Sequence, residues 1–186
     1  MKAASHRFLG EYLLSQYMPE LPRHCAQAFL MGCVEPDRNP ATYLKGSIRS
    51  QWLRGHNWDN AYRYMSRVSA RLERKEQRRV WDYYALGKLI HYIADSFTYV
   101  HNARFENGLR DHRSYERMLQ AYFLQYLNNC PEAGPARYRS AMEAVNAYHR
   151  EYVRDPISVH TDASYTVTVC GIVLLLLRRR APSHSR

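Results

Sequence analysis

The sequence predicts an all-α fold in which a single domain forms a bundle of about seven helices. Apolar residues recur three and four positions apart along most of the chain, and no stretch alternates between apolar and polar residues for long. With 186 residues, 46% of them hydrophobic, the chain is long enough for one domain with a sizeable core, and general disorder is excluded. We expect residues 1–180 to form this domain and residues 181–186 to be a short disordered tail.

The first predicted helices lie near the N-terminus. One begins after Ser5, a candidate N-cap, and carries Phe8, Leu9, Tyr12 and Leu13 on its apolar side. A second is predicted over about 22–33.

An irregular stretch is expected after the second helix. Pro36 and Pro40 should prevent a continuous helix, and the glycines near 46–57 extend the irregular chain. The remaining helices are predicted over 59–74, 76–99, 113–128, 135–155 and 163–179.

The net charge of +10 favours polyanionic partners. Nucleic acid, an anionic membrane surface and a phosphate-bearing substrate all fit such a charge, which singles out none of them. The basic run at 71–79 is interpreted as a solvated face between helices rather than as a nucleic-acid or lipid patch.

The four cysteines are expected to be buried thiols in a reducing compartment. They form no C-x-x-C pair and show no zinc-ribbon spacing, which argues against a thiol-based metal site. The N-terminal stretch lacks the apolar core of a signal peptide because Glu11 interrupts it. The expected location is the cytoplasm, with peripheral contact to a membrane surface.

The strongest apolar run, 167–177, is about half the ~20 residues that a membrane-spanning helix needs. A buried C-terminal helix is the simpler interpretation. The alternative is an interfacial anchor that presses residues 174–177 onto a bilayer.

Three potential metal ligands lie within one apolar helical pattern at 87–101. Burying His91, Asp95 and His101 there costs several kcal/mol unless each side chain has a partner, and a divalent cation would satisfy all three. His91 and Asp95 are four residues apart, so they share a helix face at about 5–6 Å between Cβ atoms and both reach one ion. His101 is expected near the helix end, where it would serve a neighbouring ion.

Further candidate ligands surround this segment in the sequence. His112 and Glu116 repeat the four-residue spacing, while His56 lies in a Gly-His-Asn loop and Asp37 follows Pro36. His6 shares a helix face with Leu9 and Leu13 and so points at the core, where a histidine needs a partner. The histidines at 24, 149, 160 and 184 have no comparable neighbourhood.

Taken in order, these residues resemble the bacterial zinc-dependent phospholipase C family. The resemblance covers the region from His6 to Glu116 and implies an all-α bundle with a cluster of three zinc ions in its core. It rests on Ser5-His6, Pro36-Asp37, Gly55-His56, His91-x-x-x-Asp95-x5-His101 and His112-x-x-x-Glu116.

The resemblance also implies which residues bind each ion. Asp95 would bridge to a third zinc, which His6 also binds. One zinc would be held by Asp37, His56, His91 and Asp95, and a second by His101, His112 and Glu116.

The sequence departs from the family pattern in two places. In the family, the third ion is completed by the amino and carbonyl groups of a processed N-terminal Trp; this chain has no such Trp, and Met1 is expected to stand in a different position. Two zinc ions are therefore expected, with the third filled through waters or another residue, or absent. Choline-selective members have an aromatic residue after the position of Asp37, whereas here Arg38 follows, so choline selectivity is not expected.

The implied activity is phospholipase C-type cleavage of a phospholipid substrate to diacylglycerol and a phosphorylated head group, with no cofactor besides zinc. Asp37 would orient or deprotonate the attacking water, or would serve only as a ligand. One alternative is a single-strand-type zinc nuclease, which shares the fold and nearly the same ligand order and would bind nucleic acid. Another is a non-catalytic helical protein that keeps metal for stability.

Overall fold

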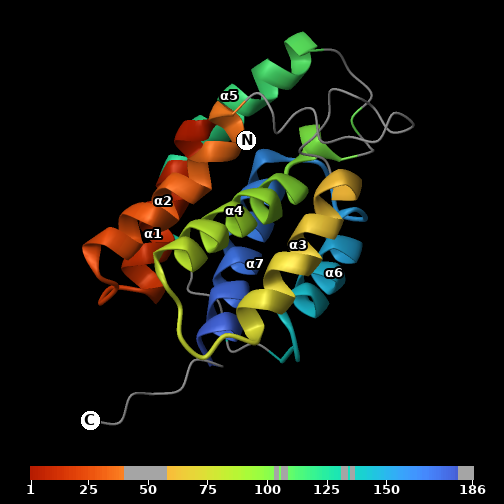
Figure 1. Ribbon diagram of the computed structural model, residues 1–186. Coiled ribbons are helices and arrows are strands. Elements are labelled where there is room, and N and C mark those ends of the chain that lie inside the picture. Colours follow the sequence, from red (N-terminus) through yellow and green to blue (C-terminus); the bar gives the residue numbers. More distant parts are fainter. Residues whose placement is uncertain (40–57, 103–104, 106–108, 131–133, 135–136, 180–186) are drawn as a thin grey trace.

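Helix α4 (Val80–Ser96) lies at the centre of the computed structural model, and α1, α2, α3 and α7 pack against it (Figure 1). The structure describes residues 1–39, 58–102, 105, 109–130, 134 and 137–179. Within these residues it contains seven α-helices, one short 3-10 helix and no strand, which confirms the predicted all-α class. The other elements are α1 (Ala3–Tyr17), α2 (Arg23–Arg38), α3 (Trp58–Glu73), η2 (Tyr99–His101), α5 (Leu109–Leu127), α6 (Ala141–Tyr152) and α7 (Val159–Arg179).

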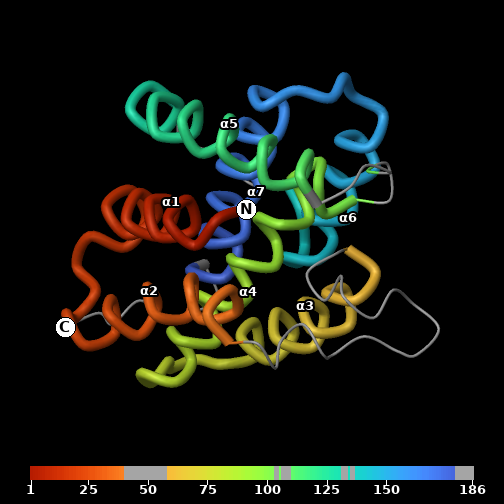
Figure 2. Tube along the Cα trace, turned by 90° about the horizontal axis from the view of Figure 1, so that it is seen from above, coloured from red at the N-terminus to blue at the C-terminus, as the bar shows by residue number. Residues whose placement is uncertain are grey.

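The N-terminus lies inside the bundle rather than on its outside. Viewed from above, it sits near the middle of the molecule, among α1, α4 and α5 (Figure 2). Met1 is buried, with 3% of its surface exposed. The first residue of the chain is therefore part of the interior.

Helix α2 is longer than the sequence predicts. The expected end at Cys33 is wrong, because the helix continues through Pro36 to Arg38. Pro36 costs only one backbone hydrogen bond in this last turn. The turn is held by the Glu35 carboxylate, which pairs with Lys88 Nζ at 2.7 Å and accepts from the Asn39 side chain at 2.8 Å.

Helix α4 begins later and ends earlier than the predicted 76–99. At its start, the Asp82 carboxylate accepts from the Arg79 backbone N–H at 3.0 Å, which supports a helix beginning at Val80. The helix ends at Ser96, and the chain then forms the 3-10 turn η2, which contains His101. His101 thus lies just beyond the helix end, as expected.

The basic run between α3 and α4 is mostly exposed, in line with its interpretation as a solvated face. Arg78 differs, since its guanidinium donates to the Leu177 carbonyl oxygen at 2.7 Å. A cation at the C-terminal end of α7 is favourable for the helix dipole. This hydrogen bond connects the basic run to the core helix α7.

Helix α7 is a core helix. By length and composition, Val159–Arg178 could cross a membrane, with a mean hydropathy of 1.4, but 61% of its apolar window is buried inside the molecule. Leu174, Leu176 and Leu177 are all buried. The interpretation as a buried helix is confirmed, and the alternative of an anchor pressed onto a bilayer is wrong because these leucines pack inside.

Three of the four cysteines are buried as predicted, whereas Cys130 is only partly buried. All four cysteines are free, and Cys25, Cys33 and Cys170 are buried. The predicted tail at 181–186 lies outside the described residues.

Candidate metal centre

The first group of predicted ligands comes together where α1, α2 and α4 meet. One donor atom from each of His6, Asp37, His91 and Asp95 lies within 4.8 Å of the others. The His91 Nε2 atom is 3.2 Å from Asp95 Oδ2, and the His6 Nε2 atom is 3.1 Å from Asp95 Oδ1. The Asp37 carboxylate completes the group, with Oδ1 3.7 Å from His91 Nε2.

Two glycines bring α2 and α4 close enough to form this group. A Cβ atom on Gly32 would overlap the Tyr84 carbonyl oxygen, and one on Gly87 would overlap the Phe29 carbonyl oxygen. The backbones can approach this closely only because neither residue has a side chain.

The close approach also orients His91. The His91 Nδ1–H donates to the Cys33 carbonyl oxygen at 2.8 Å. A carbonyl oxygen only accepts, so this bond fixes the tautomer in which Nδ1 carries the hydrogen and Nε2, with its lone pair, points toward the carboxylates. The His6 ring stacks on the His91 ring, with 3.8 Å between centroids, and this contact restricts the orientation of both imidazoles.

A second group forms between η2 and α5. One donor atom from each of His101, His112 and Glu116 lies within 4.8 Å of the others. Glu116 Oε1 is 3.5 Å from His112 Nε2 and 3.7 Å from His101 Nε2. Because α5 begins at Leu109, four residues before its predicted start, the pair at 112 and 116 lies fully on the helix.

Asp95 lies between the two groups. Its Oδ2 atom faces His91, while its Oδ1 atom is 3.7 Å from His101 Nε2. Oδ2 therefore faces an imidazole of the first group, while Oδ1 faces both His6 of the first group and His101 of the second. This is the geometry that a bridging carboxylate requires.

The Met1 amino group also lies where the two donor groups meet. Its nitrogen lies 2.5 Å from Asp95 Oδ1, 2.8 Å from His101 Nε2 and 3.5 Å from Glu116 Oε1. The expectation that Met1 stands in a different position is therefore wrong. Nothing in the residue type signals this contact, since it is made by a backbone group.

Two histidines of the site, His6 and His101, are held neutral by their surroundings. Burial lowers the pKa of His6 well below its ordinary value, and the neighbouring His91 adds to this effect. Burial also lowers the pKa of His101. Neutral imidazole is the form that binds metal, so these histidines need not lose a proton first at neutral pH.

The carboxylates are held ionised. Burial acts to raise the pKa of Asp95, but its close interactions with His101, the Met1 amino group, His6 and His91 hold that pKa well below its usual value. Burial likewise acts to raise the pKa of Glu116, but hydrogen bonds with His101 and His112 bring it below the ordinary value. Both groups are acceptors at neutral pH.

Asp162 on α7, which the sequence analysis did not single out, braces the second group. Its Oδ2 atom accepts from the Tyr99 backbone N–H and the Tyr115 hydroxyl, each at 2.9 Å, and its Oδ1 atom accepts from the Tyr152 hydroxyl at 2.8 Å. Tyr99 begins the turn that contains His101, and Tyr115 precedes Glu116. A signal was present in the sequence, since Asp162 is the one acidic residue in the C-terminal helix, five residues before its strongest apolar run.

The donor set fits zinc. Imidazole nitrogens and carboxylate oxygens are both zinc ligands, and here they converge without thiolates. The buried His6 Nδ1 atom has no hydrogen-bond partner within the described part of the chain, so this ring holds an unsatisfied polar atom beside the donor group. Of the eight predicted ligands, seven lie in the two groups, and His56 lies outside the described residues.

An all-helical bundle that gathers two groups of histidine and carboxylate donors defines a helical protein with a candidate metal site. The family model described as zinc-dependent phospholipase C matches residues 5–166, and the chain belongs to this family of zinc-dependent hydrolases. Searches of curated proteins and of solved structures found no match.

Proposed function

We propose that the protein is a zinc-dependent phosphodiester hydrolase of phospholipase C type, which cleaves a phospholipid to diacylglycerol and a phosphorylated head group. The observation that carries this proposal is the position of Asp95 between two groups of donors. A single structural ion needs only one such group. Two joined groups suit a reaction at a phosphate, and family membership supports the same chemistry.

The proposed ligands follow the two groups. Asp37, His91 and Asp95, together with His56, would hold one zinc. His101, His112 and Glu116 would hold a second, and Asp95 with His6 would serve a third. Zinc, when bound, supplies Lewis-acid charge to a phosphodiester and acidifies a coordinated water.

The two aspartates are proposed to have different roles because their surroundings differ. The Asp95 side chain is fully buried, whereas 14% of the Asp37 side chain is exposed. Asp37 is therefore accessible to water at the edge of the group, where its carboxylate would orient the attacking water or accept its proton. Asp95 would act only as a ligand.

The test begins with the zinc content of the purified chain, followed by parallel assays on phosphatidylcholine, other phospholipids and single-stranded DNA. We expect at least two zinc ions per chain and release of a phosphorylated head group. His91→Ala should lose both zinc and turnover. His24→Ala is the matched control, because His24 is an exposed histidine of α2 away from the site and its loss should change neither.

Each contrary result has a distinct meaning. Fewer than two bound zinc ions would contradict the proposed site. Cleavage of DNA without cleavage of lipid would transfer the assignment to a single-strand-type nuclease. A fully metallated protein that cleaves neither substrate would indicate a metal site with a structural role only.

A further inference from the structure

A strongly basic pocket opens beside the second donor group. It has a volume of ≈ 560 Å³ and is lined by Lys2, Arg110, Arg113 and Arg117. All four lining side chains are cationic at neutral pH. The pocket concentrates in one place a large part of the chain's excess positive charge.

The position of the pocket follows from α5. Arg110, Arg113 and Arg117 are spaced i, i+3 and i+7, so they form one stripe along the helix. At about 100° per residue, the stripe that carries His112 and Glu116 lies roughly a third of a turn away. The fourth lining residue, Lys2, follows Met1, whose amino nitrogen is 3.5 Å from Glu116.

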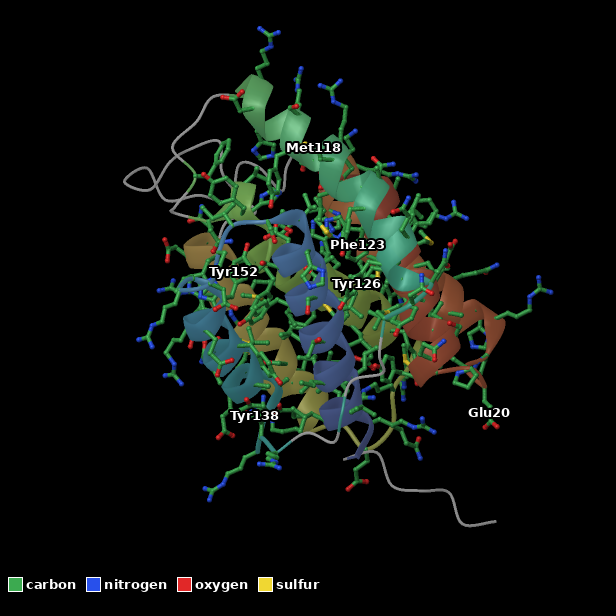
Figure 3. The ribbon with its side chains drawn as sticks, turned by 180° about the vertical axis from the view of Figure 1, so that it is seen from behind. Glu20, Met118, Phe123, Tyr126, Tyr138 and Tyr152 are labelled. Atoms are coloured by element: carbon green, nitrogen blue, oxygen red, sulfur yellow. The ribbon has the colours of Figure 1, made fainter. Side chains whose placement is uncertain are left out.

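The cations of the pocket have no acidic partner in the part of the chain that the structure describes. Within the residues that the structure describes, none of the four cations forms an ion pair with a carboxylate, and the three arginines are exposed. Figure 3 shows nitrogen-tipped side chains projecting outward from the N-terminal half of α5, beyond the labelled Met118. The positive end of the helix dipole adds to this field at Arg110.

Apolar side chains continue the same outer surface of α5. Leu124 lies seven residues after Arg117 on the basic stripe and is 40% exposed, while Met118, next to Arg117, is 55% exposed. A helix surface with cations at one end and exposed apolar residues further along is suited to the interface of a bilayer. Among the described residues, none that lines the pocket is aromatic, whereas a single-stranded nucleic acid site needs aromatic rings for stacking.

We propose that this pocket binds the phosphate of an anionic phospholipid and so holds the second donor group against an anionic membrane surface. That the substrate lies in this same membrane surface rests on the proposed function, in which the substrate is a phospholipid. The binding itself does not, because it depends only on the basic pocket and the neighbouring apolar residues.

The test measures flotation of the purified full chain with vesicles of phosphatidylcholine alone or with phosphatidylglycerol added. Wild type should bind the anionic vesicles far better. The triple variant Arg110→Gln, Arg113→Gln, Arg117→Gln should bind them on the order of 100-fold more weakly, about fivefold for each charge. Rising NaCl should weaken wild-type binding steeply and the binding of the triple variant much less.

The matched control is the triple variant Arg63→Gln, Arg67→Gln, Arg74→Gln. These arginines are exposed on and just after α3, and their removal lowers the net charge by the same three units. The control should keep most of the vesicle binding. Equal weakening by both triple variants would mean that only net charge matters and would overturn the proposal.

Two further ligands decide between sources of the anion. If the triple variant at 110, 113 and 117 loses binding of inorganic phosphate or of a single-stranded oligonucleotide but keeps vesicle binding, the proposal is overturned. Vesicle binding that needs the pocket, in a protein without lipid hydrolysis, would support this proposal and contradict the proposed function. If wild type hydrolyses lipid and the triple variant at 110, 113 and 117 binds vesicles as well as wild type, the proposed function is supported and this proposal is contradicted.

Discussion

Asp37 and Asp95 belong to the same donor group, yet the surroundings of their carboxylates differ. Asp95 lies on the central helix with both oxygens facing imidazoles, and it has no exposed surface. Asp37 lies in the last turn of α2 and is partly exposed. The two residues should therefore respond differently when their charge is removed.

We expect Asp37→Asn to lower lipid hydrolysis by about 10²–10⁴-fold, the usual contribution of a general base, while most of the zinc stays bound. Asp95→Asn should instead lose zinc, because it removes the carboxylate between the two groups. Zinc content and turnover measured on both variants test this difference. Asp111→Asn, an exposed acid on α5, serves as the control, and a parallel loss of zinc and activity in Asp37→Asn would show that Asp37 is only a ligand.

His149 is a titrating residue outside the donor groups. Its ring stacks on Trp58 at 3.6 Å between centroids, and its Nε2–H donates to Asn102 Oδ1 at 3.0 Å. Burial lowers the pKa of His149 to about 4. The residue is thus neutral in the folded state over a pH range in which it is protonated in the unfolded chain.

This difference makes folding stability depend on pH. Between about pH 6.5 and pH 4 the unfolded chain binds one more proton than the folded one at His149, so the free energy of unfolding falls as pH falls, by up to about 1.4 kcal/mol per pH unit. His149→Gln keeps a donor for Asn102 but cannot titrate, so its stability should fall less steeply. Urea unfolding of both metal-free proteins at pH 7, 6 and 5 measures the slopes, and equal slopes would contradict the assignment.

At the scale of elements, the contact between α2 and α4 determines the first donor group. We expect Gly87→Ala to destabilise the fold by about 1–3 kcal/mol and to weaken zinc binding, because the new Cβ forces apart the helices that carry Asp37 and His91. Gly10→Ala is the matched control, since its Cβ would meet the side chains of Leu30 and Cys33 at 3.0 and 3.2 Å instead of a backbone. Thermal unfolding and zinc titration measure both effects, and similar results for the two variants would count against the role of this contact.

The contact between α7 and the second donor group makes a separate prediction. Asp162→Asn keeps the side-chain size but presents an amide N–H to at least one of the three donors, which should destabilise the fold by about 1–3 kcal/mol. Zinc should be lost from the second group first, because Tyr99 and Tyr115 adjoin its ligands. Asp155→Asn also replaces a carboxylate that accepts from a tyrosine hydroxyl, that of Tyr165, but should keep the full zinc content. Loss of zinc in both variants would contradict a specific brace.

The elements also show which parts of the site the sequence could predict. The pairs His91 with Asp95 and His112 with Glu116 were predictable, because four-residue spacing on a helix fixes a shared face locally. The helical position of Asp37 was not, because Pro36 is tolerated in a last turn held by contacts to Lys88 on another helix. The hydrogen bond from His91 to the Cys33 carbonyl was equally unpredictable, since any residue type can supply a backbone carbonyl and the contact depends on how the helices pack.

At the scale of the whole molecule, the all-α class and the seven α-helices of the described residues were predictable from periodicity alone. The interior position of the N-terminus and the brace from Asp162 arise only when distant segments assemble. The two donor groups draw on α1, α2, α4, η2 and α5, so the ligands of the site come from segments spread over the first 116 residues. Bound metal would therefore link most of the bundle.

This arrangement predicts that zinc stabilises the whole fold. At a free zinc concentration about 1,000 times the dissociation constant, binding adds about 4 kcal/mol to the free energy of unfolding, which for a domain of this size raises the Tm by about 10 °C. Chelation should remove this increase and added zinc should restore it, as followed by thermal unfolding. Magnesium is the control, because it prefers oxygen ligands and should not replace zinc at a site rich in imidazoles. If chelation leaves the Tm unchanged, or if magnesium restores the Tm as well as zinc does, the donor groups do not bind zinc as a structural link between these helices.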